Sequence, residues 1–276
     1  MTINVAEISA YMFANCSSLV TLTIGSNVVN TSTLAQSANT WAVGEYSFTN
    51  CDSLTDITIS NNVIGYYMFY DCDALATITI PASVVYVGSY AFAECDSLTS
   101  VALSNAVLSD HMFYNDPVLV QLVLNSSTTS IPEYGFAGLN ITTITIPSSV
   151  TSVGAYAFAN CIYLETVYIN NSVIGEHMFD GCSRLGNNHS FTLEISEDVT
   201  EVGDYAFYNC ELLYSVKIEN AIISAHMFDG CAQISELNIP STVTTIGVAA
   251  FKNCTSLETV DINSTFTSSD AQKGCV

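Results

Sequence analysis

The sequence is poor in basic residues. Lys and Arg number 4 against 26 Asp and Glu, which gives a formal net charge of -22. A surface this acidic repels the phosphate backbone of nucleic acids, so we exclude nucleic-acid binding. The charge favours solubility and attracts basic proteins or divalent cations. We expect any cation binding to be diffuse, because the sequence has no D-x-D-x-D-G calcium loop.

Long apolar runs and targeting signals are also missing. No apolar run approaches the ~18 residues of a transmembrane helix, so no membrane span is expected. The first residues lack the basic and long apolar regions of a secretory signal, and no membrane anchor is visible. These absences leave the compartment undetermined.

Catalytic motifs are absent as well. The sequence contains no nucleophile elbow, no Gly-rich phosphate loop and no zinc-protease helix motif. We therefore expect no enzymatic activity, no cofactor and no metal site.

What the sequence does contain is a repeat, clearest between Ala82 and Ser104. Long copies contain V-G-x-Y-A-F, and short copies contain M-F preceded by Tyr or His. Typical steps between copies are 21 and 23 residues, which predicts about 11 coils. The Phe position of the copies falls at Phe13, Phe48, Phe69, Phe92, Phe113, Phe136, Phe158, Phe179, Phe207, Phe228 and Phe251.

Each copy also carries one strand pattern, L-x-x-I-x-I, as at Leu75, Ile78 and Ile80. Alternating apolar residues predict a strand with one buried face. A single strand per coil pairs in parallel with the next coil, ~4.8 Å away. The prediction is a right-handed repeat solenoid with one parallel β-sheet along one face. Short helical turns are expected at A-F-x-x-C, and tight backbone is expected at the glycine of V-G.

Two segments carry a resemblance to a known family. Residues 146–154 and 239–247 both follow I-P-S-x-V-T-x-[VI]-G, preceded by the strand pattern and followed by the F-x-x-C pattern. This combination resembles the BspA-like class of leucine-rich repeats over nearly the whole chain. The resemblance implies a single curved solenoid over residues 1–276, with the sheet on its concave face and the turns on its convex face. It also implies a non-enzymatic adhesion module at a cell surface, binding a protein ligand.

Two polar insertions interrupt the repeat. The step from Phe13 to Phe48 is 35 residues, with the surplus near residues 30–40, and the step from Phe179 to Phe207 is 28, with the surplus near residues 186–190. Both are expected to loop out of the coil, where repeat proteins often bind partners. Trp41 follows the first insertion and either packs against its base or contacts a partner.

The outward-facing strand positions change from Thr-rich to acidic along the chain. Two interpretations stay open: β-branched residues simply suit a strand, or the sheet is a platform for a protein ligand. On the second interpretation the candidate protein-binding residues are Thr58, Thr79, Thr145, Tyr168, Glu194, Lys217, Glu236, Asp261 and Trp41.

A second hypothesis concerns the ends of the repeat. The sequence begins inside a strand pattern, and neither end shows a polar capping repeat. Uncapped coils are adhesive, and a head-to-tail contact that does not close builds a filament. The chain would then be a self-assembling structural subunit. Its candidate end-to-end contact residues are Ile3, Val5, Phe13, Phe266 and Cys275.

Cysteine and histidine also follow the repeat. Nine of the ten Cys lie three residues after a Phe, and His111, His177 and His226 replace the Tyr two residues before a Phe. Stacked Cys would have parallel Cα–Cβ bonds, which is the wrong geometry for a disulfide. No coil offers a second metal ligand beside its Cys. We expect an interior column of free thiols and histidines that substitute for tyrosine.

The predicted thiol column is tested by alkylation. The denatured, non-reduced protein should take up ten alkyl groups, one for each Cys. Intact-mass measurement counts them, and a sample reduced before alkylation is the control. Extra alkyl groups in the reduced sample would reveal disulfides and contradict the column.

Overall fold

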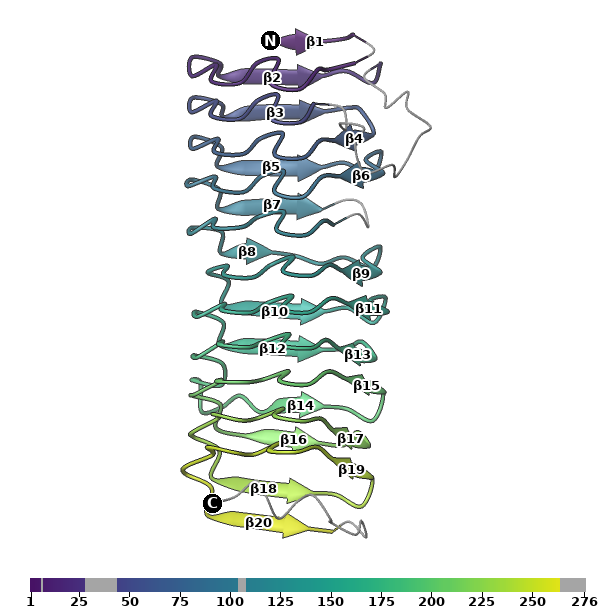
Figure 1. Ribbon diagram of the computed structural model, residues 1–276, viewed down its shortest axis with the longest axis vertical. Coiled ribbons are helices and arrows are strands. Elements are labelled where there is room, and N and C mark those ends of the chain that lie inside the picture. Colours follow the sequence, from purple (N-terminus) through teal and green to yellow (C-terminus); the bar gives the residue numbers. More distant parts are fainter. Residues whose placement is uncertain (6, 28–43, 104–107, 264–276) are drawn as a thin grey trace. The chain divides into compact units, whose positions relative to one another are not determined.

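The computed structural model describes residues 1–5, 7–27, 44–103 and 108–263. The chain divides into two compact units, Met1–Thr128 (unit 1) and Thr129–Val276 (unit 2). Within each unit, successive turns of the chain lie side by side as a parallel β-solenoid (Figure 1). The described residues include no helix that is long and apolar enough to cross a membrane.

The coils contribute main strands to parallel sheets. Alternation decides which side chains are buried: in β5 (Thr77–Ile80) both Thr are exposed and both Ile are buried. The other main strands of unit 1 are β1 (Thr2–Ile3), β2 (Thr21–Ile24), β3 (Asp56–Ile59), β7 (Ser100–Leu103) and β8 (Gln121–Leu122). Those of unit 2 are β10 (Thr143–Ile146), β12 (Thr166–Ile169), β14 (Leu193–Ile195), β16 (Val216–Ile218), β18 (Glu236–Ile239) and β20 (Thr259–Ile262).

A second row of two-residue strands was not predicted. Unit 1 has β4 (Val63–Ile64) and β6 (Tyr86–Val87), and unit 2 has β9 (Ser130–Ile131), β11 (Ser152–Val153), β13 (Val173–Ile174), β15 (Glu201–Val202), β17 (Ile222–Ile223) and β19 (Thr245–Ile246). These strands also pair in parallel between coils, as β4 does with β6. Two residues are too few to show an alternating pattern, so sequence periodicity missed this row.

Equivalent residues lie above one another within each unit, as the repeat predicts. Thr23 pairs with Thr58, and Ile146 pairs with Ile169. The Phe rings, most of them buried, form a column in each unit, with neighbouring centroids 5.3–6.0 Å apart. Such offset stacking adds to the free energy gained from burying the rings.

The F-x-x-C segments form successive turns and not the helical turns expected from the sequence. Tyr67 and Asp71 have positive φ values of 52° and 59°, which turns alternate N–H groups out of the coil. The N–H groups of Tyr67, Phe69 and Asp71 donate to carbonyls of the next coil. A helix would need these donors for its own carbonyls, so hydrogen bonding between coils replaces it.

Buried Asn side chains explain why short coils can be short. From Ile169 to Ile174 the chain is two residues shorter than from Ile146 to Val153. Asn171 is buried in this tight turn, and its Nδ2 donates to the Val173 carbonyl at 2.6 Å. Asn61 and Asn220 do the same in their coils, whereas long coils bury a Val such as Val150. The amide closes the turn through local hydrogen bonding.

The glycines of V-G lie against the backbone of the preceding coil, as predicted. A Cβ on Gly203 would lie 2.2 Å from the Glu176 nitrogen, and one on Gly154 would lie 2.3 Å from the Glu133 nitrogen. Gly88 and Gly247 show the same overlap in their coils. Any side chain here would push two coils apart.

Replacing Gly203 by Ala tests this contact. Because the obstacle is backbone, we expect Gly203→Ala to lower the free energy of unfolding by about 3 kcal/mol or more. Gly138→Ala is the control: Gly138 has a φ of +76° but nothing within 4 Å, so only strain of about 1 kcal/mol applies. Urea denaturation measures both, and equal losses would contradict the close approach.

Candidate functional site

All the predicted sheet residues within the described part of the chain are exposed. Thr58 and Thr79 lie in unit 1, and Thr145, Tyr168, Glu194, Lys217, Glu236 and Asp261 lie in unit 2. Strand pairing brings Thr145 beside Tyr168 and Glu194 beside Lys217. Their role in binding stays a prediction. Trp41, the insertion near residues 30–40, Phe266 and Cys275 lie outside the described residues.

The largest exposed side chain of the main strands in unit 2 is Tyr168, on β12. It is 52% exposed, while its neighbours in the strand, Val167 and Ile169, are buried. β12 and β14 lie side by side, and β14 pairs with β16. Tyr168, Glu194 and Lys217 each directly precede the buried Ile of their strand, so they occupy equivalent positions on one face.

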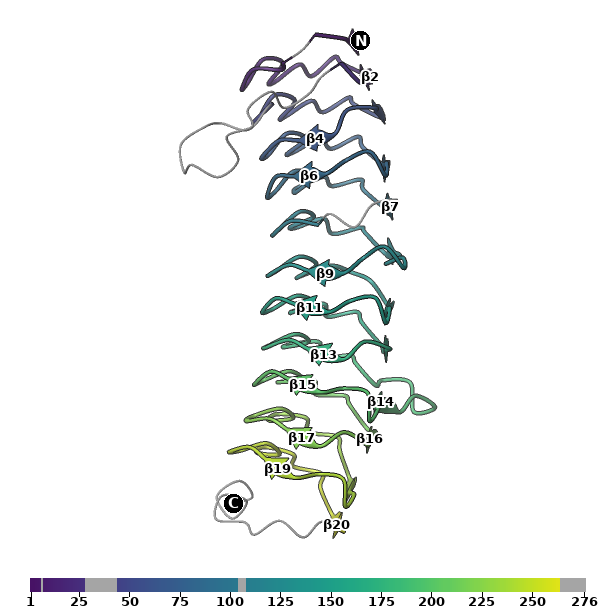
Figure 2. The ribbon, with the colours of Figure 1, turned by 90° about the vertical axis from the view of Figure 1, so that its right-hand side faces the viewer.

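The insertion at residues 186–190 lies directly before this face. Figure 2 shows it projecting on the side of the main strands. It ends at Phe191, whose ring meets that of Tyr168 edge-on at 6.4 Å. His189 lies with its ring 5.2 Å from that of Tyr214, which is 42% exposed. We call Tyr168, Phe191, Glu194, Tyr214 and Lys217, together with the insertion, the tyrosine face.

Ion pairs border the tyrosine face. Arg184, just before the insertion, lies 2.7 Å from the Glu165 carboxylate and 5.8 Å from the centre of the Tyr163 ring. Lys217 lies 3.0 Å from Glu219 and 3.7 Å from Glu194. The hydrogen bond with Glu219, and then the charges of Glu194 and Glu219, raise the pKa of Lys217.

Tyr168, Glu194 and Lys217 were predicted from the strand pattern, whereas the residues around them were not. Phe191, Tyr214 and Arg184 do not follow the repeat consensus, so they carried no signal beyond closeness to an insertion. The contact between Phe191 and Tyr168 depends on how the insertion folds back onto the sheet. An aromatic residue that immediately follows an insertion, as Phe191 does, is the signal that could have pointed to this cluster.

The nine described Cys are free thiols, as predicted, and most are buried. The structure adds a hydrogen bond: the Cys72 thiol donates to the carbonyl of Phe48, one coil earlier, at 3.3 Å. The same bond is made by Cys51, Cys95, Cys161, Cys182, Cys210, Cys231 and Cys254. Burial raises the pKa of Cys51 to about 11 and raises those of Cys95 and Cys231 well above the usual value of a thiol. Thiols held protonated are poor nucleophiles, so this column is structural.

Asp116 takes the Cys position in its coil and is completely buried. One carboxyl oxygen accepts the N–H of Cys95 at 2.8 Å, and the other has no hydrogen-bond partner. Burial raises the pKa of Asp116 to about 8, against a lowering effect of the Cys95 N–H. The charges of Glu94 and Asp96 raise it as well. The carboxyl is therefore protonated at neutral pH.

The three histidines at the tyrosine position join a second aromatic column. In unit 2, His177 stacks between Tyr156 and Tyr205 with centroids 4.4 and 4.6 Å apart, and His226 lies 4.4 Å beyond Tyr205. His111 stacks on Tyr90 in unit 1. The substitution of His for Tyr is thus confirmed.

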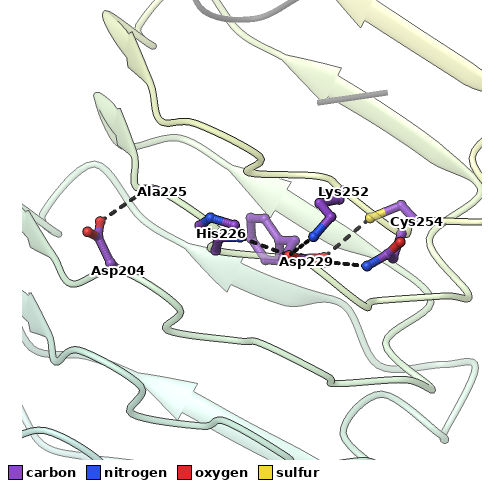
Figure 3. Close-up of polar contacts among 8 residues, drawn as sticks. Asp204, Ala225, His226, Asp229, Lys252 and Cys254 are labelled. Carbon is purple, nitrogen blue, oxygen red and sulfur yellow. Dashed lines mark hydrogen bonds and ion pairs between the residues drawn. The ribbon is translucent and has the colours of Figure 1, made fainter. Parts of the chain in front are cut away.

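Two of these histidines bind a carboxylate three residues later. His226 Nδ1 lies 2.8 Å from buried Asp229, which also accepts a hydrogen bond from Asn253 and lies 3.6 Å from Lys252 (Figure 3). His177 and Asp180 form the equivalent pair. The described residues gather no group of three or more His, Cys, Asp or Glu that could hold a metal ion. We interpret the His–Asp pairs as contacts within one coil, and the contacts of Asp229 with Asn253 and Lys252 as links to the next coil.

Parallel strands, one main strand per coil and stacked interior columns define a leucine-rich-repeat solenoid. A family model described as the BspA type leucine rich repeat region matches residues 29–115, 106–222 and 189–272. The chain belongs to this family. Leucine-rich-repeat solenoids of this kind are generally non-enzymatic binding modules.

Solved structures support the same fold. A leucine-rich repeat protein from Bacteroides ovatus is 24% identical with a TM-score of 0.60, and the match covers 74% of this chain and 59% of that one. A leucine-rich repeat protein from Eubacterium ventriosum is 21% identical with a TM-score of 0.51, over 78% of this chain and 62% of that one. The chain thus spans about three fifths of either relative. A search of curated proteins gave no match.

The buried Asp116 makes stability depend on pH. Between pH 4 and about 8 the folded chain holds a proton that the unfolded chain has lost, so stability falls as pH rises. The slope from this group approaches about 1.4 kcal/mol per pH unit. Asp116→Cys restores the column and should remove this part of the slope.

Melting temperatures of both proteins between pH 5 and 8 measure the difference. Asp96→Asn removes a neighbouring exposed carboxylate and should change the slope far less. Identical slopes for the wild type and Asp116→Cys would show that Asp116 is ionised in the folded state.

Proposed function

We propose that this chain is a protein-binding module of the adhesion type, and that its ligand docks on the tyrosine face of unit 2. The observation that carries the proposal is Tyr168, a large aromatic side chain left half-exposed among Thr and charged residues. The family supports a binding role without chemistry of its own.

The residues around Tyr168 support a role of this side chain in ligand binding. Phe191 meets its ring edge-on, so Tyr168 is supported in an outward position before any ligand arrives. A ring fixed in advance loses little conformational entropy on binding. Tyrosine and arginine are enriched at the energetic centres of protein interfaces, and Arg184 pairs with Glu165, the residue that directly precedes β12.

The Thr-rich strands of unit 1 are a weaker candidate. Thr58 and Thr79 are small, and the described part of their face carries no aromatic ring comparable to Tyr168. They suit the edge of a docking surface better than its centre.

Head-to-tail assembly gains no comparable support. Ile3 is buried within unit 1, and Phe13 is partly buried and stacks on Phe48. Val5 is exposed, but a single valine is a small surface.

Selection from a random peptide display library tests the tyrosine face without a known ligand. Peptides enriched on the immobilised protein should lose most of their binding to a Tyr168→Ala, Tyr214→Ala variant. They should keep it with Tyr114→Ala, which removes an exposed ring from unit 1. Enriched peptides that bind all three proteins equally would place the docking surface elsewhere and contradict the proposal.

A further inference from the structure

We propose that the tyrosine face recognises arginine side chains of its protein ligand, with a guanidinium stacked on Tyr168 and paired with Glu194. This inference rests on the proposed function and specifies the chemistry of the partner: a basic segment in which arginine is preferred over lysine.

The protein already shows this arrangement with an arginine of its own. The Arg184 guanidinium lies 5.8 Å from the centre of the Tyr163 ring and 2.7 Å from Glu165. One tyrosine face and one carboxylate thus hold a guanidinium at the border of the same surface. A planar cation satisfies both at once, because it can stack and donate hydrogen bonds in its own plane.

Tyr168 and Glu194 repeat the pair of groups one coil apart. Both precede the buried Ile of their strand, on β12 and β14, which lie side by side. The Tyr168 ring meets Phe191 edge-on, and the side chain is still 52% exposed. The Glu194 side chain is 64% exposed and lies 3.7 Å from Lys217, whereas Lys217 lies closer to Glu219. Glu194 is therefore the more weakly held of the two carboxylates.

The charges around the tyrosine face indicate that the segment it binds is basic. The basic residues of the described part of unit 2 are Arg184, Lys217 and Lys252, and each already lies within 4 Å of a carboxylate. Glu236 and Asp261 add further exposed negative charge on the same row of strands. A basic segment crossing the strands would meet the carboxylates of Glu194, Glu236 and Asp261, with Lys217 as the one exposed cation among them, while an acidic segment would be repelled.

Calorimetric titration with three short peptides tests the inference. One alternates arginine with glycine, one lysine with glycine and one glutamate with glycine. The wild type should bind the arginine peptide about three- to ten-fold more tightly than the lysine peptide. Binding of the glutamate peptide should be undetectable.

Variants separate stacking from general charge. Tyr168→Leu keeps an apolar contact for Phe191 but removes the ring, so the preference for arginine should disappear. Tyr168→Phe should retain it. Glu194→Gln should weaken both basic peptides, whereas Glu211→Gln, which removes one exposed charge from a turn of the same unit, should weaken them much less.

Equal affinities for the arginine and lysine peptides, or an arginine preference that survives in Tyr168→Leu, would overturn the inference. Its failure is distinguishable from failure of the proposed function. Peptides from the display library that need Tyr168 but contain no arginine would uphold the tyrosine face as a docking surface and refute its arginine chemistry.

Discussion

Hydrogen bonding between parallel coils sets the one spacing on which the rest of the structure depends. Main strands pair residue for residue, and the turns donate alternate N–H groups to the next coil. Every side chain therefore sits directly above its counterpart. This spacing lets aromatic rings stack: the centroids of neighbouring phenylalanine, tyrosine and histidine rings lie 4.4–6.0 Å apart. Glycine is needed wherever two backbones approach more closely than a Cβ permits.

The same spacing is unfavourable for carboxylates, because it places like charges close together in neighbouring coils. Asp71 is partly buried, and burial, then the neighbouring carboxylates Asp73 and Asp52, raises its pKa. Residues 1–128 contain no Lys or Arg to offset such repulsion. In unit 2 Arg184, Lys217 and Lys252 each lie beside a carboxylate, and Lys217 lies between those of Glu194 and Glu219. The charges of neighbouring coils thus act on one another, because equivalent residues lie next to each other in successive coils.

The fold could be predicted from sequence because its determinants repeat. The Phe, Cys and strand positions recur at fixed steps, so the solenoid, its register and the free thiols followed from spacing alone. The second strand row, the turns at F-x-x-C and the Asn that closes three of the short coils depend on backbone angles and single hydrogen bonds, which leave no periodic trace. Part of the candidate site was predicted: Tyr168 and Glu194 follow the strand pattern. Phe191 was not, because it meets Tyr168 at the end of an insertion that occurs once.

The glycine contact also bears on how such a chain can change length. The glycine of a long coil rests on the coil before it, and in three cases, Gly88, Gly203 and Gly247, that coil is a short one. The second-row strands of the same coils pair in the same order, β4 with β6, β13 with β15 and β17 with β19. A short coil and the long coil after it thus form one interlocked module. Duplication of a whole module would repeat the same contacts at its borders. Loss of a short coil would instead place a long coil on a long one, as where Gly154 lies against Glu133.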